Sequence, residues 1–230
     1  MSHEVIQINE NSWRIEDSGV RLFLLTGSEK ALLIDSGRDL HHARDIAESL
    51  TSLPVSLLNT HADADHIGSN MQFDAFYMHP AEEPVYRRGG RTGVILPVEE
   101  GDTMNLGQRE LRIIHLPGHT PGSIAVLDVQ NRVLISGDPI QENGRIFMFG
   151  SHRNMEDYIH SLEHLETFTN EFDEIWPSHA DIPISPSVIG GLHDGAKAVL
   201  SGKIPGKLTE VFGYSVVAYD LGFCTLLYDH

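Results

Sequence analysis

Four side chains that can bind a metal ion lie within six positions, just after an apolar run at 55–58. They are His61, Asp63, Asp65 and His66. Imidazole and carboxylate groups are the ligands that divalent first-row metals take from proteins. Positions 61, 63 and 65 alternate along extended backbone, so their side chains can converge on one side of a strand end. The segment predicts a metal site, with a helix beginning near residue 66. In the alternative, Asp65 only caps that helix and the histidines lie on the surface.

Three further residues of the same chemical types each follow a predicted strand and a short turn that contains Gly or Pro. They are His119, Asp138 and His179. A single histidine in a loop is weak evidence, since most such residues are solvated. Open α/β sheets, however, build their sites at the carboxyl ends of strands. Together with the segment after residue 58, these placements predict one shared metal centre.

The spacing of apolar residues predicts the elements that would position these ligands. Strands are expected at 21–26, 31–35, 55–58, 111–116, 123–129, 133–138, 174–176, 214–219 and 223–228, and helices at 39–50, 155–168 and 187–200. Each half of the chain has strands followed by a helix. This predicts an α+β fold in which two mixed sheets pack face to face with helices outside. A length of 230 residues favours a single domain, 1–230.

Composition excludes several partners. The chain has 33 acidic and 16 basic residues and a formal net charge of −17. Because such an acidic surface repels phosphate groups, no nucleic-acid partner is expected. Cys224 is the only cysteine, which excludes an internal disulfide and a multi-thiolate metal site. No run of about 18 apolar residues is present and residues 1–11 lack an apolar signal core. We therefore expect a cytoplasmic protein with no membrane partner; the oligomeric state is not predicted.

Four motifs together resemble those of the metallo-β-lactamase superfamily. They are His-x-Asp-x-Asp-His at 61–66, Pro-Gly-His-Thr-Pro-Gly-Ser at 117–123, Ser-Gly-Asp at 136–138 and Pro-Ser-His at 177–179. The resemblance covers roughly residues 20–180 and implies an αββα sandwich with a metal centre along one sheet edge. Activities of the superfamily include lactam, thioester and lactone hydrolysis, phosphodiester cleavage and diiron redox chemistry. The fold therefore does not determine the substrate.

The resemblance also implies a role for each ligand. His61, Asp63 and His119 would hold the first metal, Asp65, His66 and His179 the second, and Asp138 would bridge the two. Two cations about 3.5–4 Å apart would hold a bridging hydroxide as the nucleophile and polarise the bond that is cleaved. Asp65 is also the candidate catalytic residue, because it could orient the nucleophile or accept its proton.

Asp63 departs from the family pattern, in which most members have a second histidine. Two divalent cations, three aspartates (63, 65 and 138) and one hydroxide give a neutral centre, whereas histidine at position 63 would leave one positive charge. An anionic oxygen ligand favours harder metals. We therefore expect two divalent ions, with zinc as first choice and iron or manganese as alternatives. Flavodiiron proteins, which share the fold, also have a carboxylate at this position. Alternatively, Asp63 is not a ligand and one metal binds.

Two other segments could contact a substrate. Arg87, Arg88 and Arg91 form a basic cluster on an acidic chain, in which Arg88 and Arg91 are the candidates to pair with an anionic substrate. The loop 139–153 contains Phe149 and His152, which could line the substrate pocket. The alternatives are a solvated arginine loop and phenylalanines that belong to the core.

These features predict a metal-dependent hydrolase that acts on a small-molecule ester, thioester or lactone. Glyoxalase II-like and lactonase-like enzymes are the nearest branches of the superfamily. Two other classes stay open. One is a diiron protein that reacts with oxygen or NO, which bound iron and a visible absorption band would identify. The other is a metal-bearing sensor that binds a small molecule without turnover.

Overall fold

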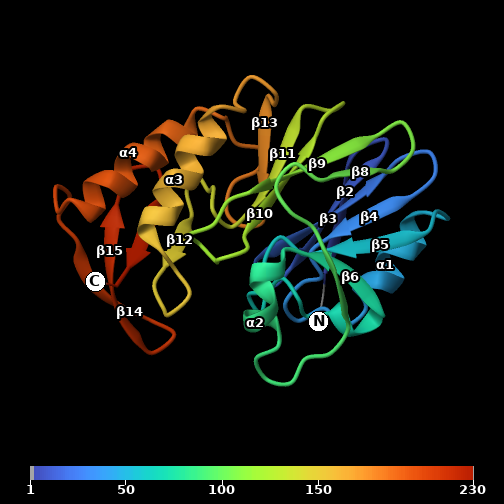
Figure 1. Cartoon of the computed structure of the whole chain (residues 1–230), viewed down its shortest axis with the longest axis horizontal. Helices are drawn as coiled ribbons and strands as arrows, with labels where there is room; N and C mark the ends of the chain where they lie inside the picture. Colours follow the sequence, from blue (N-terminus) through green and yellow to red (C-terminus); the bar gives the residue numbers. More distant parts are fainter. Residues whose placement is uncertain (1–2, 230) are drawn as a thin grey trace. The chain divides into compact units, whose positions relative to one another are not determined.

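The computed structural model describes residues 3–229, which form two compact units (Figure 1). One unit runs to Ile114 and takes in Val126–Asn131; the other comprises His115–Ala125 and the chain from Arg132 onward. The described residues form four α-helices and three mixed β-sheets, so the predicted α+β class is confirmed. The longest described α-helix has 13 residues, whereas a bilayer span needs about 20. No described helix could therefore cross a membrane.

The first unit is built on a seven-stranded sheet whose strands follow one another in chain order. The antiparallel strands are β1 (Glu4–Asn9), β2 (Ser12–Asp17), β3 (Val20–Thr26) and β4 (Ala31–Ile34). The strands that continue the sheet in parallel from β4 are β5 (Val55–Leu58), β6 (Ala75–Met78) and β7 (Val94–Pro97). Because β4, β5 and β6 are parallel, the residues that follow them meet at one edge of the sheet.

Helix α1 (Ala43–Leu50) connects β4 to β5 and begins four residues later than the sequence predicted. Its buried face consists of Ala43, Ile46 and Ala47. The later start has its cause outside the helix. The buried Asp17 carboxylate accepts hydrogen bonds from the backbone N–H groups of residues 38, 39 and 40, at 2.7, 2.9 and 3.0 Å. These bonds hold residues 38–40 outside the helix, because their N–H groups are already paired with a side chain.

The segment after β5 contains turns at 64–69 and then the short 3₁₀-helix η1 (Asn70–Gln72). The predicted helix start near residue 66 is wrong, and with it the alternative that Asp65 is a helix cap. The backbone here bonds to the chain after β4: Gly68 N–H donates to the Gly37 carbonyl at 2.7 Å, and the His66 carbonyl accepts from Ser36 N–H at 2.9 Å. A Cβ on Gly68 would lie only 2.5 Å from the Gly37 carbonyl oxygen, so this close approach requires glycine.

A five-stranded sheet has the order β13-β11-β10-β9-β8. Its strands are β8 (Thr103–Asn105), β9 (Glu110–His115), β10 (Ile124–Asp128), β11 (Val133–Gly137) and β13 (Glu174–Pro177). All but β8 were predicted to within one residue at each end. Since β11 and β13 pair in parallel, the residues that follow them lie at the same edge.

Helices α3 (Met155–Glu166) and α4 (Val188–Leu200) confirm the two helices predicted in the second half of the chain. The α3 start is fixed by Asn154, whose Oδ1 accepts hydrogen bonds from the N–H groups of Glu156 and Asp157 at 2.9 and 3.1 Å. Tyr158, on the buried face of α3, donates its hydroxyl to the Pro139 carbonyl at 2.7 Å. Burial raises the pKa of this phenol well above its usual value.

A third, four-stranded sheet was not predicted. Its order is β12-β16-β15-β14, and its strands are β12 (Arg145–Met148), β14 (Lys207–Val211), β15 (Tyr214–Asp220) and β16 (Thr225–Tyr228). The predicted C-terminal hairpin is confirmed as β15 and β16. Strand β12 lies within the expected loop 139–153 and pairs in parallel with β16, a partner about 80 residues away in sequence.

Candidate metal centre

His61 and His66 are fully buried on the loop after β5, where buried polar side chains fix the backbone. Asn59 Nδ2 donates to the His66 carbonyl at 2.8 Å, and Asn70 Nδ2 donates to Asn59 Oδ1 at 2.8 Å. The Ser36 hydroxyl donates to Asn70 Oδ1 at 2.6 Å. A buried polar network of this kind specifies one conformation, because any other leaves amide groups unsatisfied.

Asp35 is a buried carboxylate that orients both histidines, although the sequence pattern predicts only that it ends a strand. Its Oδ1 accepts a hydrogen bond from Thr60 N–H at 2.8 Å. Its Oδ2 lies 2.9 Å from Thr60 Oγ1 and 2.8 Å from His66 Nδ1. Thr60 Oγ1 in turn lies 3.0 Å from His61 Nδ1. Since the Thr60 hydroxyl donates to Asp35, it accepts from His61. Both imidazoles therefore carry their proton on Nδ1 and present the Nε2 lone pair to a metal.

Glu82 is a second buried carboxylate that was not predicted from sequence. It ends the 3₁₀-helix η2 (Pro80–Glu82), and its Oε2 accepts a hydrogen bond from Ala62 N–H at 2.7 Å. Ala62 lies between His61 and Asp63, so this bond fixes the backbone that separates two predicted ligands. In sequence, the acidic pair at 82–83 looks like the start of a solvated helix, and nothing local indicates burial.

The turn between β9 and β10 presents His119. Gly118, with φ +125°, passes so close to α3 that a Cβ there would lie 2.4 Å from the Tyr158 Cα. The Gly118 carbonyl accepts from Asn154 N–H at 2.8 Å, which ties the turn to the start of α3. His119 Nδ1 lies 2.9 Å from the Phe147 carbonyl oxygen. Because a carbonyl can only accept, Nδ1 carries the proton here too, and Nε2 is the ligand atom.

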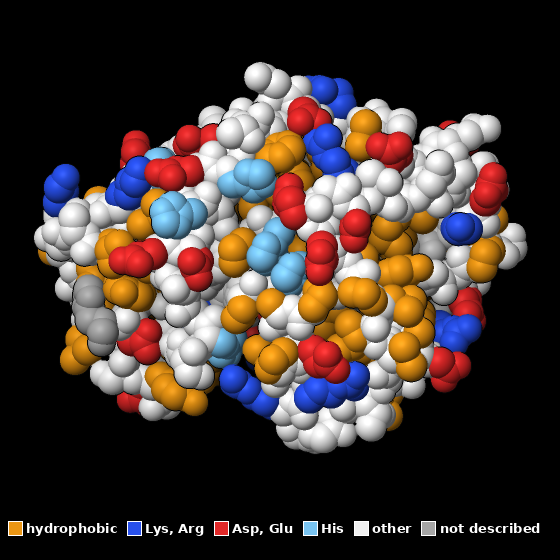
Figure 2. Space-filling view, in the orientation of Figure 1, with side chains coloured by type: hydrophobic (Ala, Val, Ile, Leu, Met, Phe, Trp, Pro, Cys, Tyr) orange, Lys and Arg blue, Asp and Glu red, His pale blue; other side chains and the backbone are white. Residues whose placement is uncertain are grey.

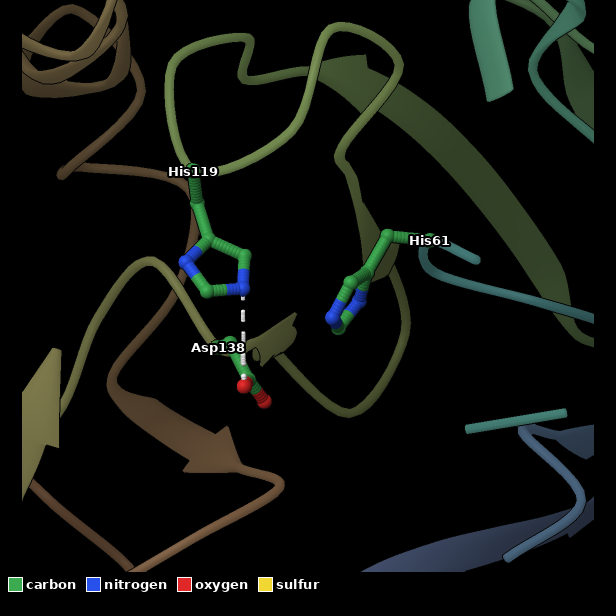
Figure 3. Close-up of side chains that lie close together, drawn as sticks. All are labelled: His61, His119 and Asp138. Carbon is green, nitrogen blue, oxygen red and sulfur yellow. Dashed lines mark ion pairs between the residues drawn. The ribbon is translucent and has the colours of Figure 1, made fainter. Parts of the chain in front are cut away.

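Asp138 and His179 follow β11 and β13, whose parallel register aligns Gly137 with Pro177. Asp138 Oδ1 lies 3.3 Å from His179 Nε2. Its other oxygen, Oδ2, lies 3.5 Å from His119 Nε2 (Figure 3). Each oxygen of Asp138 thus faces the ligand nitrogen of a different histidine, which is the arrangement that a bridging carboxylate requires.

Six side chains form two groups that could each hold a metal ion. The groups are His61, His119 and Asp138 (Figure 3), and Asp65, His66 and His179, with the ligand atoms of each group within 4.8 Å of one another. Imidazole nitrogen and carboxylate oxygen form a donor set that fits a divalent ion such as zinc, iron or manganese. The two groups are consistent with a dinuclear metal site. The first group contains His61 and His119 and the second contains His66 and His179, which is the grouping that the resemblance implied; their ligation of metal stays a prediction.

Asp63 lies beside the first group without being one of its three members. Its Oδ2 is 3.6 Å from His61 Nε2. Two ligands of one tetrahedral ion, each about 2.1 Å from the metal, are about 3.4 Å apart, so the Asp63 carboxylate is at the separation expected of a co-ligand. Asp65 Oδ1 lies 3.9 Å from His66 Nε2. Ligation by Asp63 and proton transfer by Asp65 stay predictions.

Replacing Asp63 tests its ligation directly. We expect Asp63→Ala to retain about one ion per chain, because only the first site loses an anionic ligand. Asp63→His should retain both ions and bind zinc in preference to iron, since imidazole is a softer ligand than carboxylate. Elemental analysis after dialysis against equal zinc and iron measures both effects. Wild-type metal content and preference in Asp63→Ala would show that Asp63 is not a ligand.

The residues predicted to bind substrate lie outside these two groups. Arg88 and Arg91 are exposed after α2 (Glu83–Tyr86), where Arg91 Nη1 donates to the Arg88 carbonyl at 2.9 Å. Phe149 and His152 are half-buried between β12 and α3. Contacts of these four residues with a substrate stay predictions.

Comparisons with known proteins identify the family and the fold that this chain resembles. The sequence profile of the metallo-beta-lactamase superfamily matches residues 16–172. The chain is 26% identical to the human acyl-coenzyme A thioesterase MBLAC2, over 72% of this chain and 75% of that protein. It is 34% identical to a hydroxyacylglutathione hydrolase of Gloeobacter violaceus, over 61% of this chain and 56% of that protein. A metallo-beta-lactamase from Pontibacter korlensis matches the structure with a TM-score of 0.75 at 15% identity, over 85% of this chain and 99% of that one. The predicted fold is thereby confirmed.

Proposed function

The chain belongs to the metallo-β-lactamase superfamily, and we propose that this metallo-hydrolase is dinuclear and cleaves thioesters. The observation that carries the dinuclear proposal is the Asp138 carboxylate, which offers one oxygen to the His119 side and the other to the His179 side. Of the predicted substrates, a thioester is favoured over a lactone because MBLAC2 is named as a thioesterase.

The metal ions would lower the pKa of a water molecule and polarise the thioester carbonyl. Asp35 and the Phe147 carbonyl hold three imidazole rings in their ligating orientation before substrate arrives, so little reorganisation is needed during the reaction. Asp65 is partly exposed, with 24% of its side chain accessible. It would accept a proton from the attacking water and return it to the departing thiolate, so that water adds to the carbonyl carbon and a thiol leaves.

A substrate and metal panel tests this proposal. The protein is reconstituted with zinc, iron or manganese, and hydrolysis is measured for thioesters, oxygen esters, lactones and phosphodiesters. We expect about two ions per chain and the highest kcat/KM for a thioester. Chelation should abolish the activity and added metal should restore it. Thioester hydrolysis that survives complete removal of the metal would contradict the proposal. Oxygen or NO reduction by the iron form without hydrolysis would favour the diiron redox class instead.

We further propose that Arg88 and Arg91 attract an anionic substrate. Replacing both with alanine should raise KM for an anionic thioester by about threefold, the size expected for exposed charge pairing. A neutral thioester should be nearly unaffected, and added salt should reduce the difference. The matched control is Arg132→Ala, which removes an exposed arginine paired with Asp173 at 2.8 Å. A change in KM of the same size for charged and neutral substrates would indicate a structural role for the loop.

A further inference from the structure

We propose that four aromatic side chains of the second unit bind an apolar acyl chain, which makes the substrate a fatty-acyl thioester. The aromatic cluster comprises Phe147, Phe149, Phe212 and Tyr214. The proposal rests on the thioesterase function proposed above and names the acyl group that such an enzyme would accept. Figure 2 shows hydrophobic side chains at the surface around the tip of the β14–β15 hairpin that Figure 1 labels.

The four rings form one continuous apolar surface. The Phe147 and Phe149 ring centroids are 5.5 Å apart, and the Phe147 and Phe212 centroids are 5.8 Å apart in an edge-to-face arrangement. The Tyr214 ring extends the series, with its centroid 6.0 Å from the Phe149 centroid. These separations are those of direct aromatic contact, so the rings bring β12 and the β14–β15 hairpin together at one end of the third sheet.

The sheet beneath the rings is apolar as well. In the strand register, Phe147 is opposite Leu227, and Leu227 is opposite Ala218. Directly opposed residues share a face, and so do Tyr214, Val216 and Ala218 at alternate positions of β15. Leu227 and Val216 are each only 2% exposed. An acyl chain bound to this face would therefore contact the exposed rings, while the buried Leu227 and Val216 form an apolar layer of the sheet on the same face.

The aromatic cluster is joined directly to a predicted metal ligand. The same residue, Phe147, contributes a ring to the cluster and the carbonyl oxygen that lies 2.9 Å from His119 Nδ1. The cluster thus begins at the same residue whose carbonyl orients His119. A thioester whose carbonyl is held at the metal would place the first carbons of its acyl chain beside this strand. This continuity identifies the occupant as the acyl part of the substrate.

Phe212, one of two exposed rings of the cluster, has a backbone conformation that is unfavourable for a bulky residue. Phe212 is 70% exposed and Tyr214 is 62% exposed. Phe212 and Gly213 form a two-residue turn with φ values of +52° and +80°. Such turns favour asparagine or glycine at the first position, because a bulky side chain is strained at positive φ. Strain and exposure together indicate that the ring serves a bound molecule rather than the fold.

Phe212→Asn tests the proposal without endangering the hairpin, since Asn-Gly is the preferred turn pair. Hydrolysis is compared for dodecanoyl-coenzyme A and acetyl-coenzyme A by the zinc-loaded protein. We expect the ratio of kcat/KM for dodecanoyl over acetyl to fall about tenfold. Each methylene of the acyl chain that loses its apolar contact should lower this kcat/KM ratio roughly fourfold. Removal of the Phe212 ring would expose about two methylenes. The Kd of S-dodecyl-coenzyme A, a thioether that cannot be hydrolysed, should rise by the same factor in calorimetry.

Leu208→Asn is the matched control. Leu208 lies on the same hairpin and is 72% exposed, but its register partner Val217 places it on the opposite face from Tyr214. This variant should keep the wild-type ratio and Kd. Equal effects of Phe212→Asn on both chain lengths, or no effect on the thioether, would overturn the acyl site. So would sedimentation showing a wild-type dimer that Phe212→Asn dissociates while the ratio is unchanged. If the wild type hydrolyses neither thioester, the proposed function fails, and the thioether Kd still decides the acyl site.

Discussion

Asp138→Ala is expected to release both metal ions and to lower kcat/KM for a thioester by about 10⁴-fold or more. The magnitude follows from the several kcal/mol of transition-state stabilisation that metal ions supply, since each 1.4 kcal/mol is about a factor of ten. The loss should extend to both ions because Asp138 offers Oδ1 to the His179 side and Oδ2 to the His119 side.

Elemental analysis and steady-state kinetics on the same preparations measure the two effects together. Asp138→Asn is the matched variant, because it keeps the shape of the side chain and removes only its charge. It should also lose most of its metal, since a neutral amide oxygen is a weaker ligand for a divalent ion than a carboxylate. Thermal unfolding of the metal-free proteins is the control for folding. A full complement of metal in Asp138→Ala would show that the aspartate does not bridge the ions.

The candidate ligands could be located from sequence because their residue types are chemically unusual where they occur. A histidine or aspartate directly after an apolar strand is a recognisable pattern, and parallel pairing then brings such residues to one edge. The β11 and β13 register does this for Asp138 and His179. The superfamily likewise followed from the motifs. The candidate ligands could therefore be proposed without knowledge of side-chain contacts.

Features that depend on tertiary contacts were not predictable in this way. Helix α1 starts late because Asp17, more than 20 residues earlier, binds the backbone that would form its first turn. Strand β12 exists because β16 supplies a partner from far along the chain. An isolated four-residue run such as 145–148 carries too little periodicity to indicate a strand. Local sequence patterns cannot predict either the Asp17 hydrogen bonds or the pairing of β12 with β16.

Asp35 shows the same limit inside the metal centre. In sequence it is an aspartate that ends a strand before a serine and a glycine, a pattern typical of a turn. In the structure its backbone has φ +63°, a conformation that aspartate tolerates better than most residues. That conformation directs a buried carboxylate at Thr60 and His66. Its role is visible only once the loop after β5 is folded over it.

Asp35→Asn is expected to weaken metal binding by about 10- to 100-fold at both sites, the usual cost of losing a group that orients a metal-binding histidine. The amide can accept only through one atom, so it cannot receive hydrogen bonds from Thr60 and His66 on both sides as the carboxylate does. His66 loses its orienting anion directly. His61 is affected indirectly, because the Thr60 hydroxyl that connects it to Asp35 lies 3.0 Å from His61 Nδ1.

Thr60→Val separates the direct effect of Asp35 on His66 from its indirect effect on His61. It removes the hydroxyl that connects Asp35 to His61 but leaves the 2.8 Å contact between Asp35 and His66. We therefore expect one of two zinc ions to dissociate more easily in Thr60→Val, whereas both should do so in Asp35→Asn. Competitive titration with a zinc chelator gives the two affinities, and thermal unfolding of the metal-free variants controls for a loss of fold. Wild-type zinc affinity in Asp35→Asn would mean that the imidazoles hold their orientation through packing alone. The polar network beneath them would then stabilise the loop without tuning the metal centre.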